Sequence, residues 1–167
     1  MKWFYLVVAV LGFLLMQVVV ADRVALGSVT PDFIVLMVAF VALFRGAVRG
    51  SVFGFVIGFL QDLANPGFLG LNALTKSILG YSVGRIGAKT VPDNFPFVFV
   101  LFMGVSFGHD VIYLLVYHWP DVGSALAAIF VTALPSAAYT AFFAVIMNKV
   151  LALAGPKVVE SFGKEGQ

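Results

Sequence analysis

The 167-residue chain is 62% hydrophobic and only 11% charged, whereas about 25% of residues are charged in soluble domains. This composition, with a mean hydropathy of +1.07, excludes a water-soluble globule. The net charge is +2 and the chain has no cysteine, so disulfides, thiolate metal sites and cysteine nucleophiles are excluded. A membrane-crossing helix takes about 20 residues, and the chain therefore predicts a single transmembrane domain over 1–167.

Apolar runs separated by charged or turn-forming residues predict an all-α polytopic protein with about six transmembrane helices and short loops. The first run is longer than the roughly 7–15 residues of a signal-peptide core, so we expect it to be retained. An alternative for 31–63 is one re-entrant hairpin, which would place Arg45 and Arg49 at mid-membrane depth. Pro135 predicts a kink in the last helix. The expected spans are 3–21, 31–44, 50–63, 68–87, 97–117 and 124–153.

The placement of lysine and arginine predicts the orientation, because both residues favour cytoplasmic loops. With six crossings and the N-terminus inside, the outer loops receive Arg23, and Lys76 falls within the fourth span. We therefore expect both termini to be cytoplasmic. The basic residues on the cytoplasmic side are then Lys2, Arg45, Arg49, Arg85, Lys89, Lys149, Lys157 and Lys164.

Glycines recur at four-residue spacing, so they share a helix face. In lipid, such a face lets two backbones approach closely and drives helix association. Two interpretations stay open, namely packing within the chain and an interface for a partner's helix. The glycines are Gly46, Gly50, Gly54 and Gly58 along the third span, Gly80 and Gly84 in the fourth, and Gly104 and Gly108 in the fifth.

Several polar residues interrupt the apolar runs in the half of the membrane expected to face outward. Thr30, Pro31 and Asp32 predict a helix start, with Thr30 as the N-cap and Asp32 in the first turn. Asp62 lies near a helix end, where the dipole disfavours an anion. We expect Lys76 to pair with Asp62 or Asp110, or alternatively to snorkel to the interface. This predicted polar cluster consists of Asp32, Asp62, Asn72, Lys76, His109 and Asp110.

The chain lacks the motifs of catalytic or metal sites. His109 and Asp110 are adjacent and point about 100° apart on a helix, so we do not expect them to form a catalytic dyad with each other. They either satisfy polar groups between helices, or take part in a proton relay or ligand contact. The chain has only two histidines, which make a poor metal set. We expect no metal, no cofactor and no enzymatic activity.

Some of these residues carry a resemblance to a known family. The chain contains Pro31-Asp32-Phe33, Arg45-Gly46, Arg49-Gly50, Gly54-Phe55-x-x-Gly58-x-x-x-Asp62-Leu63 and Gly67-x-x-Gly70-x-Asn72-Ala73-Leu74. This run resembles the rod shape-determining protein MreD family, and so does Asp110 followed by Val111-Ile112. The resemblance implies a non-catalytic scaffold of the cell-elongation complex, which makes peptidoglycan, in the bacterial cytoplasmic membrane.

The resemblance also implies partners. It implies direct binding to the bitopic protein MreC, in a complex with the actin-like MreB, the glycosyltransferase RodA and a penicillin-binding transpeptidase. We expect MreC's helix to dock on a small-residue face that includes Gly54 and Gly58. We expect no binding to nucleic acid.

An alternative function follows from a similarity of fold. The family is similar in architecture to the substrate-binding S-components of energy-coupling-factor vitamin transporters. In such a protein, Asn72, Lys76, His109 and Asp110 would contact the ligand. S-components resemble one another in an Ala-x-x-x-Ala pattern in the first span, but here Phe13 follows Ala9, which disfavours this alternative. An enzyme acting on lipid is a more remote one, for want of a motif.

Overall fold

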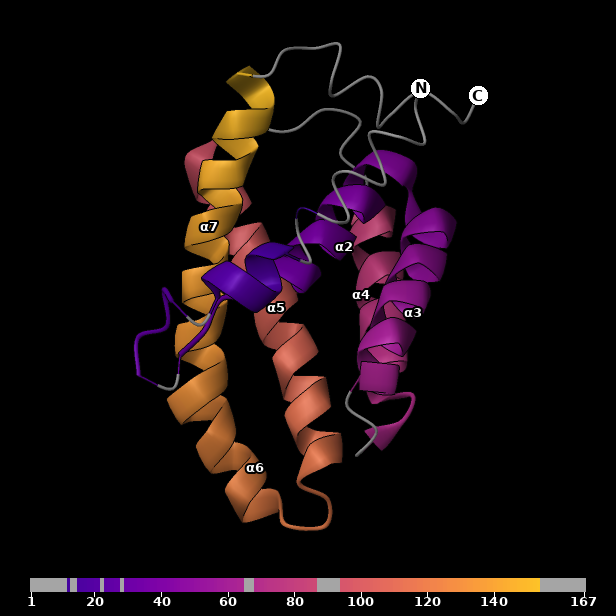
Figure 1. Ribbon diagram of the computed structural model, residues 1–167, viewed down its shortest axis with the longest axis vertical. Coiled ribbons are helices and arrows are strands. Elements are labelled where there is room, and N and C mark those ends of the chain that lie inside the picture. Colours follow the sequence, from indigo (N-terminus) through magenta and orange to yellow (C-terminus); the bar gives the residue numbers. More distant parts are fainter. Residues whose placement is uncertain are drawn as a thin grey trace.

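The computed structural model describes residues 12, 15–21, 23–27, 29–64, 68–86 and 94–153. These residues form a helical bundle in which α2 runs obliquely between longer helices (Figure 1). The described part of the chain contains no β-strand beyond an isolated bridge, which confirms the all-α class. The elements are the π-helix η1 (Met16–Val20), α2 (Phe33–Arg45), α3 (Ala47–Ala64), α4 (Leu71–Ile86), α5 (Phe95–Tyr117), α6 (Val122–Ala128), the π-helix η3 (Ile129–Ala133) and α7 (Leu134–Leu153).

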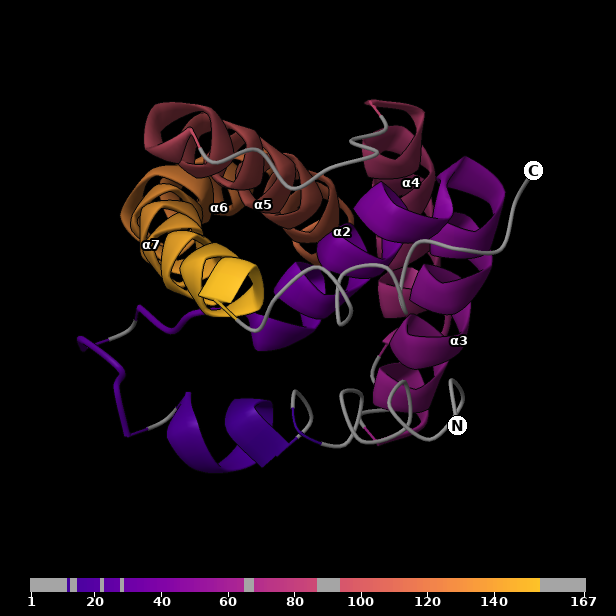
Figure 2. The same cartoon turned by 90° about the horizontal axis from the view of Figure 1, so that it is seen from above.

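Helix α2 forms the centre of the bundle. Seen from above, α3 and α4 lie on one side of it and α5, α6 and α7 on the other (Figure 2). Most residues of α2 are buried, in a core that includes Val83 of α4, Phe102 of α5 and Ala141 of α7. A helix that is apolar all round has to be enclosed by other elements or by lipid. The chain then reverses into α3 at Gly46, whose φ of 83° is a conformation that favours glycine.

The outer surface of the bundle is apolar and its interior contains charged groups. Val48 on α3, Val100 on α5 and Val131 on η3 are more than half exposed, whereas Asp62 and Lys76 are at most 1% exposed. Soluble proteins show the opposite distribution, because charged side chains are rarely buried there. The bundle therefore presents a surface suited to lipid, as an integral membrane protein requires.

Three described helical segments are long and apolar enough to cross a membrane, namely α3, α5 and the continuous Val122–Leu153. Helix α2 has 13 residues and is about 20 Å long at 1.5 Å per residue, less than a hydrocarbon core of about 30 Å. The predicted spans from 31–44 onward agree with helices to within three residues at each end. The predicted span 3–21 lies mostly outside the described residues, so six crossings and cytoplasmic termini stay predictions.

Helices α3 and α4 pack backbone against backbone. A Cβ atom added to Gly54 would overlap the backbone carbonyl of Lys76, and one added to Gly58 would overlap that of Asn72. The glycine face of α3 thus lies against α4 within the chain. This close approach brings the polar residues of α3 and α4 together. The other glycines in the contact are Gly50, Gly80 and Gly84.

The irregularity expected at Pro135 takes the form of a π-helical turn. The Leu134 N–H donates to the carbonyl of Ile129, one residue further back than in an α-helix. Proline has no N–H to donate and crowds the preceding turn, and a wider turn accommodates it. The helix continues through this turn from Val122 to Leu153.

Replacing Gly54 by alanine is expected to destabilise the protein by about 1–3 kcal/mol, the usual cost of overpacking, because the new methyl group would meet the Lys76 carbonyl. Gly104→Ala is the matched control on α5, since an added Cβ there has no atom within 4 Å and alanine favours the helix. Thermal unfolding of both purified variants in detergent makes the comparison. Equal destabilisation of the two variants would contradict the packing described.

Candidate functional site

Asp62, near the end of α3, binds the start of α4. Its buried carboxylate accepts hydrogen bonds from the backbone N–H groups of Gly70, Asn72 and Ala73 at 3.0–3.1 Å, and from the Asn72 side-chain amide at 3.0 Å. A helix N-terminus leaves such N–H groups without partners inside the helix, and its dipole favours an anion. The unfavourable position of Asp62 in its own helix is thus offset by the N-terminus of the next.

Lys76 is enclosed within the bundle and reaches Asp62 only through Asn72. Its ammonium group donates to Asn72 Oδ1 at 2.9 Å, and the Asn72 amide donates in turn to Asp62. Within the described part of the chain, no ion pair joins Lys76 to Asp62 or Asp110. The predicted direct pairing is therefore wrong, because the amide takes the place between the charges. Snorkelling is wrong too, since Lys76 is 1% exposed.

His109 connects α4 to α5. Its Nε2 lies 3.3 Å from Lys76 Nζ and 3.3 Å from Thr75 Oγ1, and its Nδ1 lies 3.0 Å from Asp110 Oδ1. Although neighbouring residues point apart on a helix, the side chains of His109 and Asp110 turn toward one another and contact each other. A hydrogen-bonded chain therefore crosses three helices, through Asp62, Asn72, Lys76, His109 and Asp110. We refer to these five residues as the polar network.

Asp32 is the N-cap of α2. Its Oδ1 accepts hydrogen bonds from the backbone N–H groups of Ile34 and Val35 at 2.9 and 2.8 Å, so Asp32 takes the role predicted for Thr30. Asp32 and Asp110 line one cavity of about 200 Å³. The structure thus brings all the residues of the predicted polar cluster into one region, with Asp32 linked to the polar network across this cavity.

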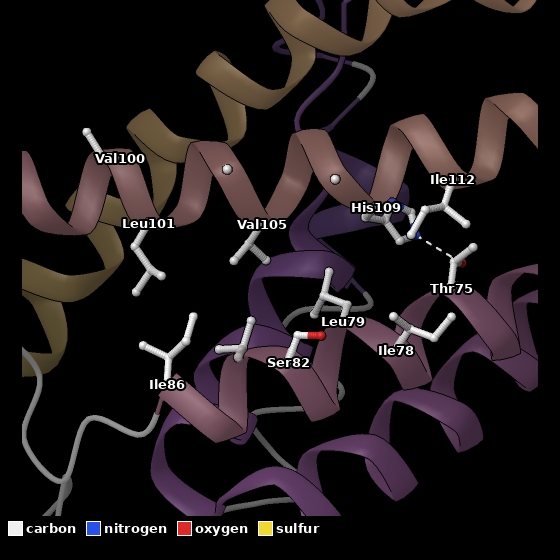
Figure 3. A pocket seen from close by; sticks show the side chains of 13 residues that line it. Thr75, Ile78, Leu79, Ser82, Ile86, Val100, Leu101, Val105, His109 and Ile112 are labelled. Carbon is white, nitrogen blue, oxygen red and sulfur yellow. Dashed lines mark hydrogen bonds between the residues drawn. The ribbon is translucent and has the colours of Figure 1, made fainter.

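An apolar groove of about 410 Å³ lies between α4 and α5 (Figure 3). Thr75 and His109 line one end of it, and most of the remaining lining is aliphatic. Gly104 and Gly108 also line the groove, and a Cβ added to either would meet no atom within 4 Å. Gly104 and Gly108 belong to the predicted set of small residues, and no described part of the chain packs against them. We call this feature the α4–α5 groove.

Two hydroxyl residues of the site were not singled out from the sequence. Thr75 is 1% exposed, contacts His109, and donates to the backbone carbonyl of Leu71 at 2.9 Å. The Thr140 hydroxyl accepts a hydrogen bond from the Asp32 N–H at 3.0 Å. Threonine is hard to select by sequence because it commonly bonds to its own helix backbone. The available signal was spacing, since Thr75 follows Asn72 by three residues and shares its helix face.

The arrangement links the positions of three helices to the ionisation of buried groups. Each member of the polar network supplies a donor or an acceptor to the next, so a change of protonation at one member changes the bonds open to its neighbours. No cluster of three or more potential metal ligands occurs among the described residues. The chemistry that the site supports is proton-dependent hydrogen bonding.

Replacing Asp62 by alanine is expected to destabilise the protein by about 3 kcal/mol or more, because the buried N–H groups at the start of α4 and the Asn72 amide lose their charged acceptor. Asp121→Ala is the matched control. Asp121 caps α6 through Ser124 at an exposed position, and the hydrogen bonds from Ser124 lower the pKa of its carboxyl. The loss of an exposed N-cap costs about 1 kcal/mol, because water can hydrogen-bond the freed N–H groups, so we expect a much smaller destabilisation than for Asp62→Ala. Chemical unfolding in detergent measures both, and a mild Asp62→Ala effect would argue against the capping role.

The similarity to a known family extends over all the residues that the structure describes. The family described as rod shape-determining protein MreD matches residues 1–153, which include the polar network and the α4–α5 groove. The comparisons with curated proteins and with solved structures give no match. On the extent of the family match, the chain belongs to the MreD family of rod shape-determining proteins.

Proposed function

We propose that this protein is a non-catalytic scaffold of the bacterial cell-elongation complex, which makes peptidoglycan. Family membership supports a role in rod shape determination. In the proposal, the protein lies in the cytoplasmic membrane with both termini inside. It binds MreC directly and links MreB to wall synthesis by RodA and a penicillin-binding transpeptidase. Most described residues belong to helices, so a partner has to bind mainly through helix faces and short loops.

The observation that carries the assignment of a partner surface is the open glycine pair on α5. Gly54 and Gly58 face the backbone of α4, so a partner cannot use the face that we expected MreC to occupy. Gly104 and Gly108 have the same spacing and open space above them. Helix association in lipid depends on close backbone approach at such pairs. We therefore assign MreC's single helix to the α4–α5 groove.

Replacing both Gly104 and Gly108 by leucine is expected to fill the groove and to reduce co-purification with MreC at least tenfold, a loss of about 1.4 kcal/mol in binding free energy. The measurement is recovery of MreC with the tagged protein from detergent-solubilised membranes. Cells that depend on the variant for rod shape should become rounded.

The matched control is the double variant Val48→Leu, Val52→Leu. It adds bulk at the same four-residue spacing on the exposed face of α3 and should leave recovery of MreC unchanged. Normal recovery with the glycine double variant, at normal accumulation in the membrane, would rule out this groove as the docking site. Loss of recovery with the valine control would do the same, because the effect would not be specific to the groove.

The alternative of a vitamin-binding S-component has less support. It requires Asn72 and Lys76 to contact a ligand, whereas these side chains bond to each other and Lys76 is 1% exposed. The side chains of Asn72 and Lys76 are therefore better explained as internal contacts of the bundle.

A further inference from the structure

We propose that His109 is a proton-operated latch between α4 and α5. When its imidazole is neutral, the side chain holds α5 to Lys76 of α4. When the imidazole gains a proton, this contact is replaced by repulsion and the α4–α5 groove widens at its His109 end. The proposal concerns the chain alone and does not depend on which partner occupies the groove.

The distances define the neutral state of the latch. The His109 Nδ1 lies 3.0 Å from Asp110 Oδ1, and a carboxylate can only accept, so Nδ1 carries the hydrogen. In a neutral imidazole, Nε2 is then an acceptor. Lys76 has three N–H donors and no acceptor; one of them serves Asn72 at 2.9 Å, and another can serve His109 Nε2 at 3.3 Å. Neutral His109 thus bridges Asp110 and Lys76.

Protonation removes this bridge. In the imidazolium both ring nitrogens are donors, so Nε2 can no longer accept from Lys76, and two cations stand 3.3 Å apart. Thr75 offers the new hydrogen an acceptor. Its hydroxyl hydrogen is used by the backbone carbonyl of Leu71 at 2.9 Å, which leaves lone pairs on Oγ1 facing Nε2 at 3.3 Å. Thr75 also belongs to α4, so α5 stays attached to α4 there while the repulsion from Lys76 widens the groove, and Lys76 retains its bond to Asn72.

Charged groups face His109 from more than one helix. Asp110 on α5 attracts the extra proton and Lys76 on α4 repels it. Asp32 and Asp62 act on Lys76 from the start of α2 and the end of α3, and the Tyr113 ring lies against the imidazole. Helices α2 and α7 also pack against α5, and their charged residues are Arg45 and Lys149, both near their C-terminal ends. Histidine is the side chain that changes charge between pH 5 and 8.

The latch lies at one end of the groove, so a small movement of His109 changes the width of the groove there. His109 and Thr75 form one end of the lining, and Ile86 and Val100 form the other (Figure 3). Most of the stretch between these ends is lined by aliphatic side chains, and among the described residues that line it no hydrogen bond joins α4 to α5 apart from those of His109. Separation at the His109 end therefore meets little polar resistance along the groove.

The test is the distance between nitroxide labels in the full chain reconstituted in phospholipid vesicles. The chain has no cysteine, so labels attach only to the introduced pair Leu74→Cys, Val116→Cys, at exposed positions on α4 and α5 near the latch. From pH 8 to pH 5 we expect this distance to increase by about 1–2 Å, the usual size of an interhelical shift. A second pair at the far end, Ile86→Cys and Val100→Cys, should move less.

Three variants decide whether His109 is responsible. His109→Gln, which cannot be protonated, should abolish the shift, and Lys76→Gln should abolish it as well by removing the opposing cation. His118→Gln, which alters the other histidine of the chain, should keep it. The proposal is overturned if the parent distance does not change with pH, if His109→Gln shifts like the parent, or if His118→Gln alone loses the shift. If His109→Gln does not fold, an unchanged pH-dependent shift of the label distance in Lys76→Gln would also overturn the proposal.

Discussion

Charged groups enclosed among apolar helices have to find their hydrogen-bond partners inside the protein, because neither lipid nor an apolar core provides any. In this bundle the requirement is met by the carboxylate of Asp62, which accepts from the N-terminus of α4. The bond to Asn72 then extends the arrangement to Lys76 and across to His109 on α5. This line of contacts joins α3, α4 and α5.

The polar network depends on how closely α3 and α4 approach each other. Glycines at the contact allow the two backbones to meet without intervening side chains, and this proximity brings Asp62 within reach of the α4 N–H groups. On the other side of α4 no equivalent contact exists along most of α5, where Gly104 and Gly108 border the groove. One helix thus has a tightly packed face and a loosely packed one. In the proposed role, this asymmetry provides both a tightly packed part and a part at which another helix can enter.

Much of the fold could be predicted from the sequence because its main determinant is local. A run of apolar residues has to be helical in a membrane, and the boundaries from Phe33 to Leu153 follow the predicted spans closely. The importance of Asp62, Lys76 and His109 was also predictable, since an ionisable residue in an apolar run is costly and needs a reason. The partners of these residues could not be predicted. Whether Lys76 bonds to Asn72, Asp62 or Asp110 depends on how each helix is rotated about its axis, and spacing along the chain does not define this rotation.

The sequence by itself determined that the protein is an all-helical membrane protein and which segments between Phe33 and Leu153 form its helices, and it singled out the glycines and charged residues that interrupt the apolar runs. The tertiary structure alone decided which glycine face is already covered and which is open, and that Asp62 caps α4 instead of pairing directly with Lys76. The physical reason is that composition and periodicity act within one helix. Hydrogen-bond partners and open surface are properties of how several helices are placed together, and this placement is a balance among all their contacts.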